Sequence, residues 1–301
     1  MWKLKILFQF VLAALPGGER VNVWLQYLAG SHSPKNLGDL MVQGFQRVKV
    51  LDQYVDIEGS TVLEIGTGWD AINPLVFYVM GAKTCFTYDH VPHVRYSLVR
   101  RIINQMEERF DEVQAASSLP ASVLQNRISK IKAAVTLREL FDVAGIVYRA
   151  PGDATATDLP DSSIDIVYSY AVLEHVSEKV LNGITTESKR VLRTGGVAYH
   201  GIGLHDHYVR FSKTISRVNF LKYPEWLWAF WVKNKISYTN RLREQHFIDI
   251  FQQCGAQIVW KQNKVDLDDI EVVRTMNIDK RFHDLTPEEL AVYYSEMILT
   301  F

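Results

Sequence analysis

The chain has 301 residues, 48% of them hydrophobic, which is enough to bury a large core and excludes a disordered or fibrous protein. With 33 Lys+Arg and 34 Asp+Glu, the formal net charge of −1 argues against a nucleic-acid partner and favours an enzyme that acts on a small molecule. The two cysteines, Cys85 and Cys254, form no CxxC pair, so we expect no disulfide framework, no structural zinc site and a reducing cytoplasmic location.

The N-terminus holds an apolar run, residues 6–15, preceded by two lysines. The run resembles a weak signal peptide, but Gln9 interrupts it, it is too short to span a bilayer, and Pro-Gly-Gly follows where a cleavage site would stand. We expect an amphipathic helix packed on the domain, with a weak membrane-surface contact as the alternative. The sequence divides into an N-terminal helical segment, 1–58, and one domain, 59–301; it leaves the oligomeric state open.

From about residue 60 onward, predicted strands and helices alternate. Short apolar runs bounded by turn residues predict the strands, and apolar residues at helical spacing predict the helices. Such alternation is typical of βαβ units, with a parallel sheet covered by helices on both faces. The expected strands are 61–65, 83–88, 146–148, 164–169 and 197–202, and the expected helices are 72–80 and 178–192.

Two stretches exceed the roughly thirty residues that a crossover helix and its loops need. The first is an insertion over 94–143, in which we expect helices at 94–115 and 122–141. The second, over 204–238, is a candidate aromatic cap that would form the substrate pocket and can also be the core of a helical subdomain. Its aromatic residues are Tyr208, Phe211, Phe220, Tyr223, Trp226, Trp228, Phe230, Trp231 and Tyr238.

The C-terminal part predicts a capped helix and a final strand. Thr286 as N-cap, Pro287 at the first helical position and Glu289 as capping-box partner mark the beginning of that helix. Upstream, the Asn-Arg-Leu-Arg sequence at 240–243 predicts a helix start with a solvated basic face, with contact to an anionic substrate as the alternative. The expected elements are a helix over 240–253, a strand over 257–260, the capped helix, and a strand over 297–301.

A glycine turn, Gly66-Thr67-Gly68, lies between the first strand and the first helix of this domain. Such a turn lets the backbone approach a ligand and points free N–H groups at it. Asp89 follows Gly68 by 21 residues, at a strand end where a carboxylate can hold two ribose hydroxyls. Asp153, after the third strand, can accept from the exocyclic amine of an adenine. Together these residues predict a nucleoside site at the carboxyl edge of the sheet.

Five sequence blocks, in order, resemble the class I S-adenosylmethionine (SAM)-dependent methyltransferases, nearest their type-11 small-molecule branch. The resemblance extends over about residues 60–260. It implies an α/β fold of the Rossmann-like methyltransferase type, with a mostly parallel seven-stranded sheet whose final strand is antiparallel, and SAM as the cofactor. The blocks are 62–68, Asp89, 152–154 with 159–167, 172–176, and 190–196.

The resemblance also implies which residues bind the cofactor. Glu64, Gly66 and Gly68 would line its methionine end, and Asp89 would hold its ribose. Asp153 and Ala154 would flank the adenine, and Ser169 and Tyr170 would follow the fourth strand beside the sulfonium. The full implied set is Glu64, Gly66, Thr67, Gly68, Asp70, Asp89, His90, Asp153, Ala154, Ser169 and Tyr170.

The glycine turn departs from the family pattern at one position. Asp70 stands where the family usually has a third glycine, and Trp69 precedes it. Asp70 either narrows the approach to the turn or faces the amino group of the cofactor. A pyrophosphate would be repelled by this carboxylate, which favours methyl transfer over a dinucleotide enzyme. A nicotinamide-dependent oxidoreductase and a non-catalytic binding module remain alternatives.

Methyl transfer from SAM needs mainly alignment, and a base only for an oxygen or a protonated nitrogen acceptor. We expect the base in the loop His205-Asp206-His207 after the fifth strand, with Asp206 or another acid orienting an imidazole. The two histidines can also be solvated loop residues. His175 is a second catalytic candidate that is more typical of a structural histidine, and His200 is a third.

The sequence gives no reason to expect a metal. Some related O-methyltransferases use acids beside a histidine to hold a divalent cation, but Ala171 occupies a position where a ligand acid would help, leaving Glu174 and His175. The expected partner is a small, partly apolar acceptor or a sugar-lipid intermediate, and we expect no nucleic acid.

Overall fold

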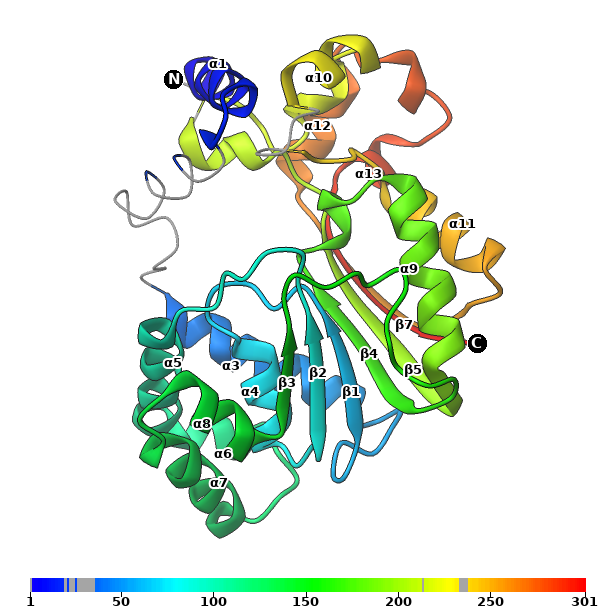
Figure 1. Ribbon diagram of the computed structural model, residues 1–301. Coiled ribbons are helices and arrows are strands. Elements are labelled where there is room, and N and C mark those ends of the chain that lie inside the picture. Colours follow the sequence, from blue (N-terminus) through cyan, green and yellow to red (C-terminus); the bar gives the residue numbers. More distant parts are fainter. Residues whose placement is uncertain (1, 19–20, 22–24, 26–35, 213, 233–237) are drawn as a thin grey trace. The chain divides into compact units, whose positions relative to one another are not determined.

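The computed structural model describes residues 2–18, 21, 25, 36–212, 214–232 and 238–301 (Figure 1). The other positions, which fall in the expected N-terminal segment and the expected cap, lie outside the described residues. The chain divides into two compact units, so that the expected segment 1–58 is shared between them. Unit 1 comprises Met1–Ser31, Ala171–Asn182 and His200–Met297, and unit 2 comprises His32–Tyr170, Gly183–Tyr199 and Ile298–Phe301.

The strands form one seven-stranded sheet in the order β3-β2-β1-β4-β5-β7-β6. Strand β1 pairs in parallel with both β2 and β4, and β2 pairs in parallel with β3. Because β1 is covered on both faces, its apolar run is nearly continuous, and Val62 and Leu63 are fully buried. These features confirm the Rossmann-like fold class. The strands are β1 Thr61–Ile65, β2 Thr84–Tyr88, β3 Ile146–Arg149, β4 Ile164–Tyr170, β5 Leu192–Gly203, β6 Gln257–Val265 and β7 Val292–Thr300.

The insertion of unit 2 contains four helices, so the expectation of two was wrong. The first expected helix is interrupted at Arg109, and the second stops before Thr136. The Thr136 hydroxyl caps a new helix by accepting from the N–H of Glu139, which explains the second break. Figure 1 shows these helices gathered beside β3. The helices that begin in unit 2 are α3 Leu37–Leu51, α4 Ile72–Val79, α5 Tyr96–Glu108, α6 Phe110–Ala115, α7 Ala121–Ala133 and α8 Leu137–Ala144.

Unit 1 has its own hydrophobic core, built largely from the expected aromatic cap. Tyr208, Phe220 and Trp228 are buried there together with Ile6 and Phe282. Many of the cap aromatics therefore serve as core residues, the second of the two roles that the sequence allowed. The helices that begin in unit 1 are α1 Trp2–Ala14, η1 Leu173–His175, α9 Glu178–Val191, η2 His207–Phe211, η3 Asn219–Lys222, α10 Glu225–Val232, α11 Glu244–Gln253, α12 Leu267–Thr275, η4 Lys280–Phe282 and α13 Pro287–Leu290.

The N-terminal helix α1 packs on unit 1 through part of its surface. Ile6 and Leu12 are buried, whereas Phe8 and Val11 are about half exposed. Among the described residues, no helix is both long enough and apolar enough to cross a membrane. The contact of α1 with a membrane surface stays a prediction.

The basic segment before α11 differs from the expectation. Arg241 and Arg243 are 4% and 1% exposed, so the expected solvated basic face is wrong. The guanidinium of Arg243 donates to the carbonyl of Leu290 at 2.9 Å and to those of Leu204 and Val292. A guanidinium carries five N–H donors in a planar fork, so one side chain can satisfy several buried carbonyls. Arg243 therefore ties the segment after β5 to the segment before β7.

Candidate cofactor site and histidine cluster

The glycine turn follows β1 in unit 2. Gly66 and Gly68 have φ values of +85° and +69°, in the left-handed region that favours glycine. The N–H of Gly66 donates to the carbonyl of Tyr88 at 2.8 Å, which joins the end of β1 to the end of β2. A Cβ placed on Gly68 would meet no atom of the described residues within 4 Å. The turn thus has open space beside it, as a cofactor held against its backbone requires.

Asp89 lies directly beside this turn. Its carboxylate accepts from the N–H of Gly68 at 3.2 Å and of Val91 at 3.3 Å, and Nδ1 of His90 lies 3.2 Å from Oδ1. Burial raises the pKa of Asp89, but these hydrogen bonds outweigh burial and leave the pKa below its usual value. An ionised carboxylate can accept about four hydrogen bonds, and three contacts are already present, so Asp89 can accept at least one more, from a ribose hydroxyl.

A polar network underlies the turn. Glu64 on β1 is fully buried and accepts from Nδ2 of Asn73 at 2.9 Å and from the hydroxyl of Thr87 at 2.5 Å. The hydroxyls of Thr87 and Thr67 lie 2.5 Å apart. Burial raises the pKa of Glu64 to about 8, against the lowering effect of the Thr87 and Asn73 bonds. Glu64 is therefore mostly protonated at neutral pH. Neither Asn73 nor Thr87 was expected from the sequence, although a threonine in a buried strand could indicate a polar partner.

Asp70 contacts the beginning of α4. Its Oδ1 accepts from the N–H of Ile72 at 3.2 Å, and Ala71 between them adopts a left-handed conformation with φ of +51°. Burial raises the pKa of Asp70. The neighbouring Trp69 stacks on His93, with ring centroids 4.5 Å apart. This stacking was not expected from the sequence, since His93 lies 24 positions further on.

The remaining implied cofactor residues follow β3 and β4. Asp153 is exposed and accepts from the N–H of Thr155 at 2.8 Å and from its hydroxyl at 2.7 Å, which lowers the Asp153 pKa. Ala154 is half-buried and Ser169 is fully buried. The guanidinium carbon of Arg47 lies 3.8 Å from the ring centroid of Tyr170. Their cofactor contacts stay predictions.

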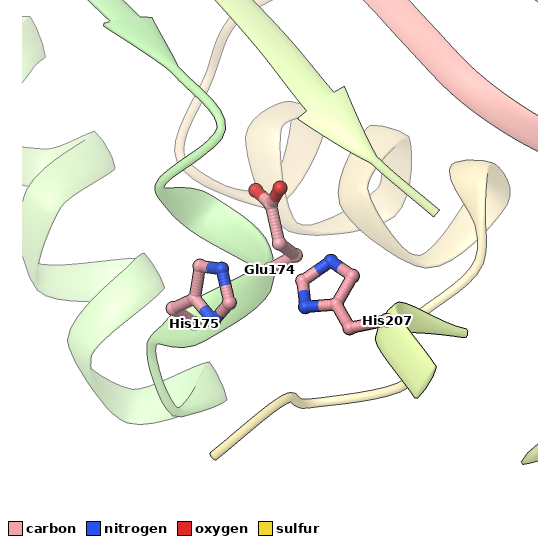
Figure 2. A group of neighbouring side chains, drawn as sticks. All are labelled: Glu174, His175 and His207. Atoms are coloured by element: carbon pink, nitrogen blue, oxygen red, sulfur yellow. The ribbon is translucent and has the colours of Figure 1, made fainter. Parts of the chain in front are cut away.

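In unit 1, Glu174, His175 and His207 form a cluster (Figure 2). Each offers one potential ligand atom, and these atoms all lie within 4.8 Å of one another. His205 adjoins the cluster, with its ring centroid 5.0 Å from that of His207. The proximity of Glu174 to His207 was not expected from the sequence, because the two residues are separated by 33 positions and follow different strands.

Two further expected site residues have clear local roles. Asp206 is buried and accepts from the N–H of Tyr208 at 2.8 Å and from Nδ2 of Asn219 at 2.9 Å, so it caps η2. Burial raises its pKa, and its role in orienting a histidine stays a prediction. His200 is buried against Phe251, and burial lowers its pKa to about 3. A histidine with that pKa stays neutral near pH 7.

A family model described as a methyltransferase domain, of type 11, matches residues 114–200. The matched segment contains Asp153, Ala154, Ser169, Tyr170 and His175, whereas the glycine turn precedes it. No curated protein matches the chain.

Similar solved structures include three methyltransferases. A SAM-dependent methyltransferase from Methanosarcina mazei is 14% identical, with a TM-score of 0.44, over 83% of this chain and 95% of that one. A putative SAM-dependent methyltransferase from Listeria monocytogenes is 12% identical, with a TM-score of 0.44, over 86% and 97%. One from Leishmania major is 10% identical, with a TM-score of 0.45, over 99% and 83%. At these TM-scores they carry no information on the substrate of this chain.

Proposed function

Because residues 114–200 match a methyltransferase-domain model of type 11, we propose that the chain is a SAM-dependent methyltransferase that transfers a methyl group to a small molecule through an oxygen or nitrogen nucleophile. The observation that carries this proposal is the pairing of the left-handed, open glycine turn with Asp89, whose carboxylate accepts from the N–H of Gly68. This pairing places a carboxylate beside a glycine turn that a ligand can approach closely, as a nucleoside requires.

The cofactor, when bound, supplies a methyl group on a sulfonium and so carries the activation that the reaction needs. Asp89 would hold the ribose hydroxyls, and Asp153 and Ala154 would flank the adenine. The backbone of the turn would line the methionine end. The protonated Glu64 is hydrogen-bonded to Asn73 and Thr87, and Thr87 contacts Thr67 of the turn, so this buried network would support the turn.

The proposed base is a histidine of the loop after β5, with His205 as the first choice. It is half-buried, and an imidazole has an unperturbed pKa near neutrality, so it can accept a proton at working pH. His207, Asp206 and His175 are further proposed members of the catalytic set. A base is needed only if the acceptor atom loses a proton during transfer.

The proposed acceptor is small and partly apolar. The net charge of −1 supports this over nucleic acid, whose binding depends on many basic contacts to phosphates. In the expected cap, Trp226 and Phe230 are 72% and 61% exposed and offer apolar surface. Contact with a membrane surface through α1 would bring a lipid-linked acceptor within reach of the protein.

Binding and transfer experiments test the proposal separately. Calorimetry should detect binding of S-adenosylhomocysteine to the protein. If the protein binds NAD and does not bind S-adenosylhomocysteine, it is an oxidoreductase instead. Metabolite pools incubated with methyl-labelled SAM should then yield a labelled small molecule. Transfer of the labelled methyl group to bulk nucleic acid would refute the proposal of a small acceptor. Cofactor binding without methyl transfer to any pool would favour a non-catalytic binding module.

A further inference from the structure

Outside the candidate cofactor site, the Glu174, His175 and His207 cluster is the strongest group of metal-ligating side chains in the described residues (Figure 2). We propose that it binds one divalent transition-metal cation, such as Zn²⁺, in unit 1. The inference does not depend on the proposed methyl transfer, and it concerns a question that the sequence alone leaves open, namely whether the protein binds a metal.

The donor set fits such a cation. Two imidazole nitrogens and one carboxylate oxygen are ligands that Zn²⁺ and Fe²⁺ accept, whereas Mg²⁺ and Ca²⁺ prefer oxygen ligands alone. A set of three protein ligands also leaves coordination positions for water or for an anionic group of a bound molecule.

The distances allow binding after a small closure. Ligand atoms about 2.0–2.2 Å from a common cation lie about 3–3.5 Å from one another. The potential ligand atoms here lie within 4.8 Å of one another, so side-chain movements of about 1 Å would bring them to bonding distance. The rings of His175 and His207 already have centroids 4.9 Å apart.

A carbonyl orients the imidazole of His175. Its Nδ1 lies 3.0 Å from the carbonyl oxygen of Tyr238. A carbonyl can only accept, so Nδ1 carries the hydrogen and Nε2 keeps its lone pair for a cation. This arrangement, in which one ring nitrogen donates to a carbonyl and the other faces the metal, is typical of metal-binding histidines.

Glu174 is held in place by backbone contacts. Its side chain is almost fully buried, and Oε1 accepts from the N–H of Gly203 at 3.1 Å. Asn240 holds the turn that carries Glu174, because its Nδ2 donates to the carbonyls of Leu173 and Val176 at 2.8 and 3.0 Å. Burying a carboxylate is costly, and a cation beside it offsets that cost.

Cobalt binding tests the proposal directly. Protein treated with chelator and then titrated with Co²⁺ should bind one ion per chain, develop visible d–d absorption, and lose that absorption when Zn²⁺ is added. In wild-type protein, two hyperfine-shifted imidazole N–H resonances should appear, one for each histidine ligand. This second measurement needs no variant. Failure to bind Co²⁺ with a Kd below about 100 µM, or absence of the shifted resonances, would overturn the proposal.

Variants locate the site. His175→Ala, His207→Ala and Glu174→Gln should each weaken Co²⁺ binding by more than about 100-fold, since loss even of a residue behind a ligand costs about 10- to 100-fold. His283→Ala removes an exposed histidine elsewhere in unit 1, and His205→Ala removes the neighbour outside the cluster. Both should bind Co²⁺ as wild type does. Equal binding by all five variants would show that the ion binds elsewhere.

Gly203→Ala adds a test of geometry without removing a ligand. A Cβ at this position would lie 2.7 Å from Oε1 of Glu174 and must displace the carboxylate. We expect Co²⁺ binding about 10- to 100-fold weaker, with an unchanged thermal unfolding midpoint as the control for folding. A folded Gly203→Ala protein with wild-type affinity would exclude Glu174 as a ligand.

Discussion

Two buried glutamates, Glu64 and Glu174, show how surroundings assign different roles to the same side chain. Glu64 in unit 2 contacts the neutral amide of Asn73 and the hydroxyl of Thr87, and its burial favours the protonated form. Glu174 in unit 1 accepts from a backbone N–H and lies beside two imidazoles that can share a cation with it. The neutral carboxyl group of Glu64 therefore supports the glycine turn, whereas the side chain of Glu174, beside two imidazoles, belongs to the proposed metal-ligand set.

The largest expected effect concerns the anchor of the loop that carries the histidines of unit 1. Arg243→Met leaves the carbonyls of Leu204, Leu290 and Val292 without their charged donor. We expect the free energy of unfolding to fall by about 3–5 kcal/mol, because each buried carbonyl that loses its partner costs about 1–3 kcal/mol and removal of a buried cation offsets part of the loss. Urea unfolding measures it. Arg274→Met, at an exposed arginine that pairs with Glu271 and Glu288, is the control and should cost less than about 1 kcal/mol.

In unit 2, Asp89→Ala should weaken S-adenosylhomocysteine binding by about 100-fold or more, because a charged acceptor for two hydroxyls is lost. Titration calorimetry measures the change, and thermal unfolding shows whether the turn still folds. Asp142→Ala, which removes an exposed carboxylate of α8, serves as the matched control. If the two variants bind equally well, Asp89 does not hold the ribose.

The third prediction separates the proposed base from the proposed metal site. His205→Gln should lower turnover of the acceptor by about 100-fold, with S-adenosylhomocysteine and Co²⁺ binding unchanged. His207→Ala should lose Co²⁺ binding whatever its turnover. The rates come from labelled SAM and the acceptor that screening identifies, with His283→Gln as the control. Full turnover by His205→Gln would remove it as the base.

The sequence predicts the pairing of the glycine turn with Asp89 in unit 2 better than it predicts the cluster of Glu174, His175 and His207 in unit 1, because the evidence for the pairing is local. Gly66, Gly68 and Asp89 lie at the ends of two neighbouring strands whose apolar runs are easy to recognise, so their pairing follows from the topology. Glu174 and His207 follow different strands, and no periodicity links them. The partners of Arg243 are backbone carbonyls, which leave no pattern in the sequence, so the sequence predicts a solvated basic segment where the structure has a buried one.

The interruptions within the insertion illustrate the same limit. The apolar pattern from 94 to 115 continues through Arg109 and does not indicate that the helix is interrupted there. Such a pattern shows which face of a helix is buried, but not whether the helix axis continues. At Thr136 a signal was present, since a threonine followed three residues later by Glu139 is typical of a helix N-terminus. No side-chain cap marks the first break, at Arg109, whereas the Thr136 cap marks the second.

The smallest expected effect is a change in how stability depends on pH, and it tests the protonated state of Glu64. The pKa of Glu64 is raised from 4.5 to about 8, so the folded state binds more protons than the unfolded state between these values. The stabilisation from this group is complete below about pH 4.5 and is lost as the pH rises through about 8. One pH unit within this window corresponds to about 1.36 kcal/mol, so raising the pH from about 5.5 to 7.5 should cost wild-type protein about 2 to 3 kcal/mol through Glu64.

Glu64→Gln keeps the shape of the side chain and cannot ionise. The free energy of unfolding of this variant should therefore not show the fall that Glu64 causes between about pH 5.5 and 7.5. Urea unfolding of wild type and variant at both pH values gives the difference, in which the opposite contribution of the buried His200 cancels. Glu58→Gln, at an exposed glutamate shortly before β1, is the matched control and should keep the wild-type dependence. If Glu64→Gln also keeps the wild-type pH dependence, Glu64 is ionised in the folded protein and does not differ from Glu174 in this respect.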